Sequence, residues 1–330
     1  MHVEPWVWAV TLGLAIAFLI FDVFYIGRSP HEPSMAESAR HLAFFIGAAA
    51  LFAVGVYVVS GSTYGTEFVA GWLTEYSLSI DNLFVLLIIM TKLRVPRELQ
   101  QSALLVGIVL ALVLRGLFIA AGAAAINAFS WVFYLFGAFL VYTAVRLARD
   151  DDNEADDYRE GRAVQWVRRH VPMSTEYQGA HLFTRQNGRR LATPMMIVIV
   201  ALGTTDLLFA LDSIPAIYGI TQEPYLVLTA NLFALMGLRQ LYFLIGGLLQ
   251  RLVYLSLGLS VLLGFIGVKL ILHALHENEL PFINGGQPVS GAPDMPTWLS
   301  LVVIVGILLV TVVASVVKSR RDRQLSSSRR

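Results

Sequence analysis

Long apolar segments and short polar ones alternate along the whole length of this chain. Nine of the apolar segments are long enough to cross a hydrocarbon core of about 30 Å as helices. They comprise residues 5–26, 42–59, 66–91, 102–124, 128–147, 193–219, 225–248, 253–273 and 297–317. Because lipid offers the backbone no hydrogen-bond partners, each segment must satisfy its own polar groups by coiling into a helix. The pattern predicts an all-α membrane protein with about nine transmembrane helices.

The composition agrees with this fold class and narrows the chemistry. Of the 330 residues, 56% are hydrophobic and 14% are charged, which is far from a soluble composition. The first segment has neither a basic leader nor a small-residue cleavage site, so we expect it to be retained. The chain contains no cysteine. Metal ligands are therefore expected to be oxygens, or imidazole nitrogens, because no thiolate is available.

Lysine and arginine are concentrated in every second polar segment. They follow the first, third, fifth and seventh apolar segments, whereas the alternate segments hold none: 60–65, 125–127, 220–224 and 274–296. The positive-inside rule then places the N-terminus outside and the C-terminus in the cytoplasm, in a cell (inner or plasma) membrane. We expect one transmembrane domain over residues 1–330. It includes a cytoplasmic loop at 148–192 with a short amphipathic helix at 162–169, and a basic cytoplasmic tail at 318–330.

Two groups of three apolar segments, 66–147 and 193–273, look like copies of each other. Each begins with an acid-bearing segment, and each carries an arginine within its second segment, Arg115 and Arg239. Because three spans separate the copies, the second lies inverted relative to the first. Inverted repeats are typical of secondary transporters, which bind their substrates near the membrane midplane between the repeats.

Acidic residues at membrane depth are the main chemical signal. Each copy holds a carboxylate, an aspartate six residues later and a neutral oxygen-bearing side chain next to it: Glu75, Asp81 and Asn82 in the first, Asp206, Asp212 and Ser213 in the second. A charged side chain at the centre of a bilayer costs roughly 2.5–3.5 kcal/mol on insertion scales, so such residues mark functional sites. The duplicated acids predict a cation site between the two copies.

The six-residue spacing restricts how these acids can act together. Six residues rotate a helix by roughly 600° and advance it by about 9 Å, so Glu75 and Asp81 cannot hold one ion on an unbroken helix. Two arrangements follow. Asp81 and Asp212 meet across the axis between the copies, or the helices unwind locally, as Pro215 would permit in the second copy.

Carboxylate, amide and hydroxyl oxygens are the ligands of hard cations such as Mg²⁺, Ca²⁺ and Mn²⁺. Arg115 and Arg239 would balance two of the four acidic charges, which leaves a formal charge that matches a divalent cation. Protons bound to the acids would be displaced as the metal enters. Asn231, Ser79 and Thr205 are secondary candidates for oxygen ligands.

At these residues the sequence resembles the TerC/Alx family of integral membrane proteins, named for tellurium resistance. The resemblance covers nearly the whole chain, and its most specific blocks are DNLFV and DSIPAI. The matching stretches are 75–85 (EYSLSIDNLFV), 134–143 (YLFGAFLVYT), 183–194 (FTRQNGRRLATP), 206–217 (DLLFALDSIPAI) and 231–239 (NLFALMGLR).

The resemblance implies a multi-pass transporter related to the LysE-type superfamily, with manganese export as its activity. It also implies that the acids of both motifs, with Asn82 and Ser213, form the metal site. One position departs from the family pattern. The family's second motif carries a glutamate three residues before its first aspartate, where this chain has Gly203. A missing carboxylate would lower the affinity, change the preferred metal or alter the coupling to protons.

The leading hypothesis is proton-coupled efflux of Mn²⁺, contributing to metal homeostasis and stress resistance, with Ca²⁺ or Mg²⁺ as alternative substrates. The expected partners are the metal ion, protons and membrane lipid; we expect no prosthetic group and no nucleic acid, and leave protein partners open. A different class of function is a membrane scaffold of a metal-stress (tellurite-resistance) complex that recruits partners through the loop 148–192. We do not expect an enzyme: the Gly-x-Gly-Asp signature of intramembrane aspartyl proteases is absent, because two threonines separate Gly203 from Asp206.

Overall fold

The structure, a computed structural model, describes residues 3–28, 34–129, 131–149, 162–186, 189–245, 254–278, 280–281, 283–289, 293 and 295–327. Within these ranges, the side chains of residues 19, 21–28, 81, 84, 127, 162, 186, 189, 245 and 320–327 are not described. The predicted ligand Asp81 therefore has a described backbone, but its side chain lies outside the described part of the protein.

Ten α-helices and one β-hairpin make up most of the described residues. The helices are α1 (Pro5–Arg28), α2 (Met35–Ser60), α3 (Ser62–Lys92), α4 (Arg97–Ala128), α5 (Val132–Arg149), α6 (Arg162–His170), α7 (Pro194–Tyr218), α8 (Pro224–Ile245), α9 (Leu255–His276) and α10 (Thr297–Ser327). The hairpin consists of β1 (Phe183–Gln186) and β2 (Arg189–Ala192), and a short 3₁₀ helix covers Asn284–Gly286.

The nine predicted apolar segments correspond to nine of these helices, all except α6. Eight helices in the described part of the chain, α2–α5 and α7–α10, are long and apolar enough to cross a membrane. In α1 the apolar portion with described side chains, Pro5–Phe18, is shorter. The prediction of an all-α membrane protein is therefore confirmed, with eight described membrane-crossing helices rather than nine.

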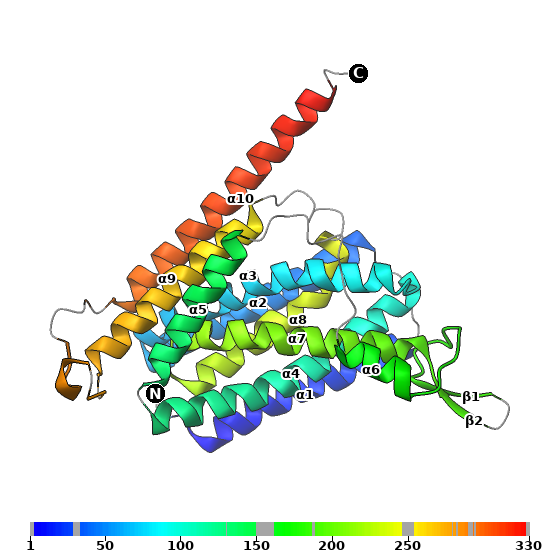
Figure 1. The fold of residues 1–330 in the computed structure, drawn as a ribbon, viewed down its shortest axis with the longest axis horizontal. Coiled ribbons are helices and arrows are strands. Elements are labelled where there is room, and N and C mark those ends of the chain that lie inside the picture. The colour runs from blue at the N-terminus through cyan, green and yellow to red at the C-terminus, as the bar shows by residue number, and fades with distance from the viewer. Residues whose placement is uncertain are drawn as a thin grey trace.

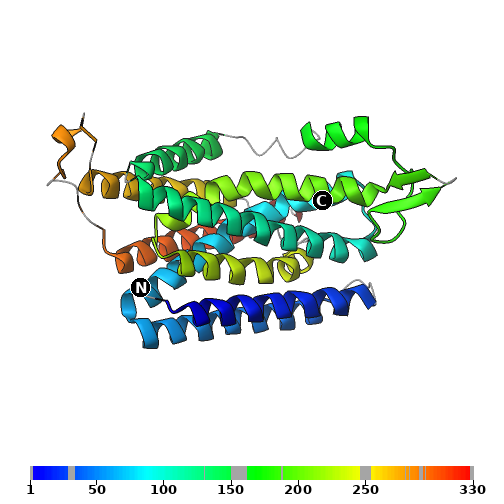
Figure 2. The ribbon, with the colours of Figure 1, turned by 90° about the horizontal axis from the view of Figure 1, so that it is seen from below.

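The long helices form two groups that differ in direction. Helices α4 and α7 run roughly along the long axis of the molecule, while α5, α9 and α10 cross them obliquely (Figure 1). Helices α1 and α2 lie side by side along one face (Figure 2). The oblique group is tightly joined at the crossing of α5 and α9, where a Cβ atom on Gly137 would lie 2.8 Å from the carbonyl oxygen of Gly267. Only glycine allows two helices to approach so closely.

The helix pairs that contact each other follow a reciprocal pattern. Helix α3 packs on α8, α4 packs on α7, and α5 packs on α9. In the two copies α3 corresponds to α7, α4 to α8 and α5 to α9. Exchanging the copies therefore converts the α3–α8 pair into the α7–α4 pair and leaves the α5–α9 pair unchanged. These are the contacts that an inverted repeat of 66–147 and 193–273 predicts; the repeat itself stays a prediction.

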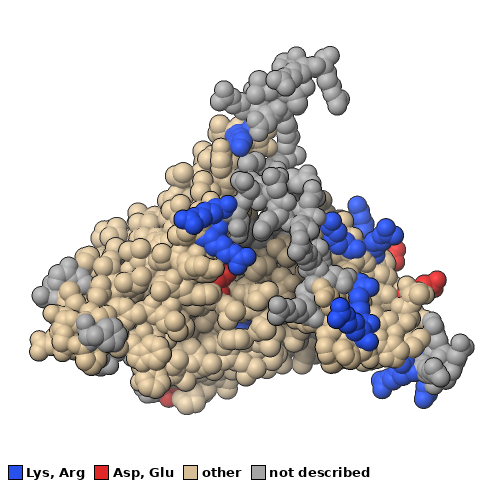
Figure 3. Space-filling model, in the orientation of Figure 1, with Lys and Arg blue, Asp and Glu red and all other residues tan. Residues whose placement is uncertain are grey.

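Lys and Arg side chains gather at one end of the molecule. In the space-filling view they lie at the right-hand end, where α6 and the hairpin are found, and in the upper middle over α5 and α10, while the left-hand end is largely free of them on this face (Figure 3). We call the end that carries α6, the hairpin, the end of α3 and the start of α4 the basic end. By the positive-inside rule, it is the end expected to face the cytoplasm.

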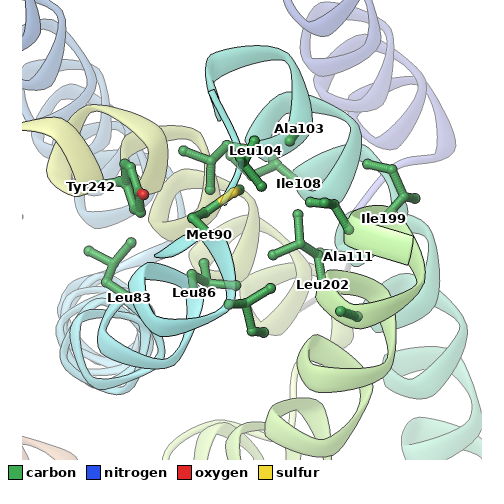
Figure 4. Close-up of a cluster of buried hydrophobic side chains, with 14 of the residues drawn as sticks. Leu83, Leu86, Met90, Ala103, Leu104, Ile108, Ala111, Ile199, Leu202 and Tyr242 are labelled. Carbon is green, nitrogen blue, oxygen red and sulfur yellow. The ribbon is translucent and has the colours of Figure 1, made fainter. Parts of the chain in front are cut away.

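Two apolar clusters lie between helices α3, α4, α7 and α8, one toward each end of these helices. The cluster nearer the basic end is built from α3, α4, α7 and α8, and includes Leu83, Met90, Leu104, Leu202 and Tyr242 (Figure 4). The cluster nearer the opposite end is built from the other halves of the same helices, and includes Phe68, Ile119, Ile214, Tyr218 and Leu226. The middle of the bundle, between the two clusters, is where the charged residues lie.

The loop between the copies contains more structure than expected. The predicted amphipathic helix is present as α6, with Val164 buried against the core and Trp166 60% exposed. The hairpin, which comprises eight residues, was not predicted; it is a local addition to an all-α membrane protein. Its signal was present: the sequence places Asn187-Gly188, which lies outside the described residues, between the two strands, and this dipeptide favours a two-residue hairpin turn.

Candidate functional site

A buried arginine joins the two acid-bearing helices. Arg115 of α4 donates from Nη1 to Oε2 of Glu75 in α3 at 2.8 Å, and from Nη2 to Oδ1 of Asp206 in α7 at 3.2 Å. Its Nε also lies 3.5 Å from Oδ2 of Asp206. The planar guanidinium thus binds one carboxylate with two nitrogens and the other with the third. We call Glu75, Arg115 and Asp206 the charge cluster.

The charge cluster is shielded from solvent. The side chains of Glu75 and Arg115 are 0% and 2% exposed, and that of Asp206 is 14% exposed. Removing these charges from water is costly, so only their mutual pairing makes the burial tolerable. Arg115 pairs with the first acid of both motifs; its charge-balancing role at a metal site stays a prediction.

Several oxygens around the charge cluster have no hydrogen-bond partner among the described residues. Oε1 of Glu75 and Oγ of Ser79, one turn further along α3, are both buried and unpaired. The Asn231 amide of α8 faces Glu75 as a hydrogen-bond partner of its carboxylate, although the contact falls outside strict hydrogen-bond geometry. Unpaired buried polar groups are rare in native proteins and call for a structural or functional reason. These three residues could supply oxygen ligands to a cation.

The second acid of α7 lies in a different environment. Asp212 is half-buried and lines a cavity of about 200 Å³ together with Ser213, Asn82 of α3, and Thr143 and Arg146 of α5. Oγ1 of Thr143 donates to Oδ1 of Asp212 at 3.2 Å. Oγ of Ser213 is buried without a partner. We call this the Asp212 cavity; it collects carboxylate, amide and hydroxyl oxygens from three helices.

The structure separates the five predicted ligands whose side chains it describes into two places rather than one. Glu75 and Asp206 belong to the charge cluster, and Asn82, Asp212 and Ser213 belong to the Asp212 cavity. Among the described side chains, no three of His, Asp or Glu lie close enough together to hold a metal ion. The expectation that Asp81 meets Asp212 stays a prediction, since the Asp81 side chain is not described.

The acid-bearing helices are continuous, so the alternative of local unwinding is wrong for this conformation. Helix α3 runs unbroken from Ser62 to Lys92, and α7 continues through Pro215 to Tyr218. Proline removes only the intrahelical bond to the carbonyl of Leu211, next to Asp212. So close to the end of the helix, this loss frees one carbonyl without ending α7.

The remaining predicted residues lie on the same helices but make different contacts. Arg239 of α8 is 7% exposed, and with the Gln240 amide turned to satisfy its neighbours, Arg239 Nη2 donates to it at 3.0 Å. Thr205 is half-buried beside the charge cluster residue Asp206. The charge-balancing role of Arg239 and the ligand role of Thr205 stay predictions.

Gly203, where the family resemblance implies a glutamate, faces α4. A Cβ atom at this position would lie 2.5 Å from Cδ2 of Leu110. The contact belongs to the apolar cluster nearer the basic end, one turn before Asp206. In this chain a leucine therefore fills the space that an acidic side chain would need.

The sequence did not single out Thr143 and Arg146 as site residues. Both lie on α5, and their spacing of three residues puts them on one helix face, which is turned toward Asp212. A signal existed, because a basic residue at membrane depth in the third segment of a repeat is as unusual as one in the second. The oblique crossing of α5 over α7, which brings them together, could not be inferred from spacing.

Comparison with known proteins gives a consistent result. The integral membrane protein TerC family matches residues 60–323. An uncharacterized membrane protein of Mycobacterium bovis is 46% identical over 326 residues, which cover 98% of this chain and 82% of that protein. An uncharacterized membrane protein of Myxococcus xanthus is 38% identical over 317 residues, covering 96% of this chain and 94% of the relative.

A third relative carries a functional name. It is the putative membrane-bound redox modulator Alx of Escherichia coli, 34% identical over 330 residues, which cover 97% of both chains. No solved structure matches this chain. The similarity therefore extends over the whole membrane-crossing region, including both acid motifs.

Proposed function

This chain belongs to the TerC family of integral membrane proteins, and from that premise we propose that it transports a hard divalent cation across the membrane. The substrate we propose is Mn²⁺, exported from the cytoplasm in exchange for protons. The observation that carries the proposal is the Asp212 cavity, in which a carboxylate, an amide and hydroxyls from different helices surround one space at membrane depth.

The donor set in this cavity favours a hard cation. Asp212, Asn82 and Ser213 offer only oxygens, and the chain contains no cysteine. Oxygen ligands suit Mn²⁺, Mg²⁺ and Ca²⁺, whereas softer metals prefer sulfur or imidazole. Asp81, one residue before Asn82 on α3, is proposed to complete the set and to bring the formal charge of the two aspartates to −2.

Arg146 gives the cavity a resident positive charge. It lines the cavity and acts electrostatically on Asp212. A cation that enters must compete with this charge for the same carboxylate. We propose that Arg146 stabilises the ion-free transporter and is displaced from Asp212 when a metal or a proton arrives.

The charge cluster has a different role in this proposal. Arg115 already pairs with both Glu75 and Asp206 and balances one of their two charges, and apolar clusters lie on both sides of them. A cation can use their oxygens only if Arg115 releases one carboxylate. We propose that this exchange is part of the transport cycle, and that the buried side chains of Ser79 and Asn231 then supply additional oxygens.

The name of the Alx relative suggests redox modulation as another class of function. Within these 330 residues there is no cysteine, so this chain cannot perform thiol–disulfide exchange itself. Oxygen-lined sites at membrane depth favour ion transport over that class. They also favour it over a scaffold, which would need no such site.

The test is metal uptake into proteoliposomes that contain the purified full chain. Uptake of Mn²⁺ is compared with that of Ca²⁺, Mg²⁺ and Zn²⁺, with and without a pH gradient. Asp212→Asn and Asp81→Asn each keep the side-chain size but remove the charge, and are expected to reduce Mn²⁺ uptake to the level of empty liposomes.

The matched control is Glu176→Gln, which makes the same kind of change at an exposed position in the loop before the hairpin. It is expected to transport like the unmodified protein. Equal Mn²⁺ uptake by Asp212→Asn and the unmodified protein would contradict the proposal. If Ca²⁺ or Mg²⁺ were transported in place of Mn²⁺, with the same dependence on Asp212, only the choice of metal would change.

A further inference from the structure

A second cavity lies at the basic end, far from the acids of the bundle. Its volume is about 560 Å³, within the range of small-molecule sites. Three cationic side chains line it: Lys92 and Arg94 at the end of α3, and Arg168 of α6. Ser174 and Thr175 add hydroxyls. Among the described residues, no carboxylate lines this cavity. We call it the basic cavity.

The walls of the basic cavity are held in place by hydrogen bonds. The Tyr177 hydroxyl donates to the carbonyl of Leu93 at 2.8 Å, which ties the loop to the end of α3. Ser174 N donates to the carbonyl of Ala192 at 2.8 Å, which ties the same loop to the hairpin just before α7. Burial raises the pKa of Tyr177 more than nearby Arg168 lowers it, so the phenol keeps the proton that it donates. The cavity is therefore preformed.

Arg94 occupies a backbone position that favours glycine. Its φ is 52°, and the bond from Val95 N to the carbonyl of Met90, at 2.9 Å, closes the end of α3. This left-handed residue directly after a helix is commonly glycine, because other residues pay a steric cost there. Helix termination does not require an arginine here, and the Arg94 side chain lines the cavity.

The cavity also has an apolar side that continues toward α6. Leu93, Met173 and Ile197 line it. The neighbouring α6 is short and amphipathic, with Trp166 60% exposed. An exposed tryptophan beside arginines is typical of a helix that lies in the headgroup region of a membrane. The basic cavity thus lies at the height of lipid headgroups, at the ends of α3 and α7.

We propose that the basic cavity is a binding site for an anionic, phosphate-bearing molecule. Arginine guanidinium groups and hydroxyls bind phosphate oxygens through charge-assisted hydrogen bonds. The phosphate belongs either to the headgroup of an anionic phospholipid or to a free phosphate ester. Because the lining residues come from α3, α6 and the start of α7, a bound phosphate connects the basic ends of the two acid-bearing helices.

The experiment is native mass spectrometry of the full chain released from detergent in the presence of phosphatidylglycerol, with phosphatidylcholine as the zwitterionic comparison. The test variant is Arg94→Gly combined with Arg168→Gln; glycine suits the backbone at position 94. The matched control, Arg185→Gln combined with Arg190→Gln, also removes two cations at the basic end, but neither residue lines the cavity.

The unmodified protein and the control are expected to retain phosphatidylglycerol in preference to phosphatidylcholine. The test variant is expected to bind it more weakly by about fivefold for each cation removed. Glycerol 3-phosphate is the second probe. If it binds with the same dependence on Arg94 and Arg168 and phosphatidylglycerol does not, the site takes a free phosphate ester. The proposal is overturned if neither probe depends on these residues, or if the control loses as much binding as the test variant.

Discussion

The charge cluster and the Asp212 cavity use similar residues in opposite ways. In the cluster, Glu75 and Asp206 are held by Arg115 in a space closed by apolar side chains. In the cavity, Asp212 accepts one hydrogen bond from a neutral threonine and has open space beside it. The two sites lie on the same helix, α7, only six residues apart.

The difference shows that an acid at membrane depth is not by itself a binding site. Where the carboxylates are paired with an arginine, they hold α3, α4 and α7 together, and a cation can use them only after Arg115 releases one of them. Where a carboxylate is only weakly paired, it remains available to an ion. In the proposed transport cycle, the charge cluster maintains the helix arrangement and Asp212 makes the first contact with the substrate.

The largest effect is expected from removing the cation of the charge cluster. Arg115→Leu leaves two buried carboxylates without a partner, and breaking a buried ion pair in this way costs about 3–5 kcal/mol. We expect the protein to unfold at a much lower denaturant concentration in detergent micelles. Asp212→Asn should lower the stability far less, because the asparagine keeps an oxygen that accepts the hydrogen bond from Thr143.

The triple variant Glu75→Gln, Arg115→Leu, Asp206→Asn checks that charge is the cause. Removing all three charges should restore most of the stability lost in Arg115→Leu, since no unpaired charge is left buried. If Arg115→Leu were as stable as Asp212→Asn, the proposed difference between the charge cluster and the Asp212 cavity would be wrong.

A second prediction concerns the glutamate that the family resemblance implies at position 203, between α7 and α4. Gly203→Glu places a side chain against Leu110, and overpacking of this kind costs about 1–3 kcal/mol. Combining it with Leu110→Ala makes room and should recover part of the stability. Unfolding of both variants in detergent measures the difference; a fully stable single variant would show that the α4–α7 contact readily opens.

Much of this arrangement could be predicted from the sequence, and the reason is periodicity. Nine apolar segments gave nine helices, and the buried acids and Arg115 were identified because charge is costly in lipid. The sharing of Arg115 between Glu75 and Asp206 could not be predicted, because it depends on how α3, α4 and α7 pack together and not on the spacing of residues in the sequence. The same holds for Arg146, which reaches Asp212 only through the oblique direction of α5.

A third prediction concerns the cation that the cavity itself contains. Arg146→Gln removes a positive charge next to Asp212 without altering the charge cluster. For partly solvated charges this repulsion is worth on the order of 1 kcal/mol, so Mn²⁺ should bind about fivefold more tightly. Titration of the detergent-solubilised protein with Mn²⁺ measures the dissociation constant. Arg149→Gln, on the same helix but not lining the cavity, is the matched control and should leave it unchanged.

The smallest effect is expected from the single hydrogen bond that holds Asp212. Thr143→Val has nearly the same shape but cannot donate, and a hydrogen bond of this kind contributes about 0.5–1.5 kcal/mol. Because the bond favours the charged carboxylate, its loss should weaken Mn²⁺ binding severalfold, while Thr143→Ser should keep most of the affinity. The effect must disappear when Asp212→Asn is also present, since no charged carboxylate then remains. An equal effect of Thr143→Val with and without Asp212 would mean that Thr143 acts by packing α5 on α7, and that the cavity does not position its carboxylate.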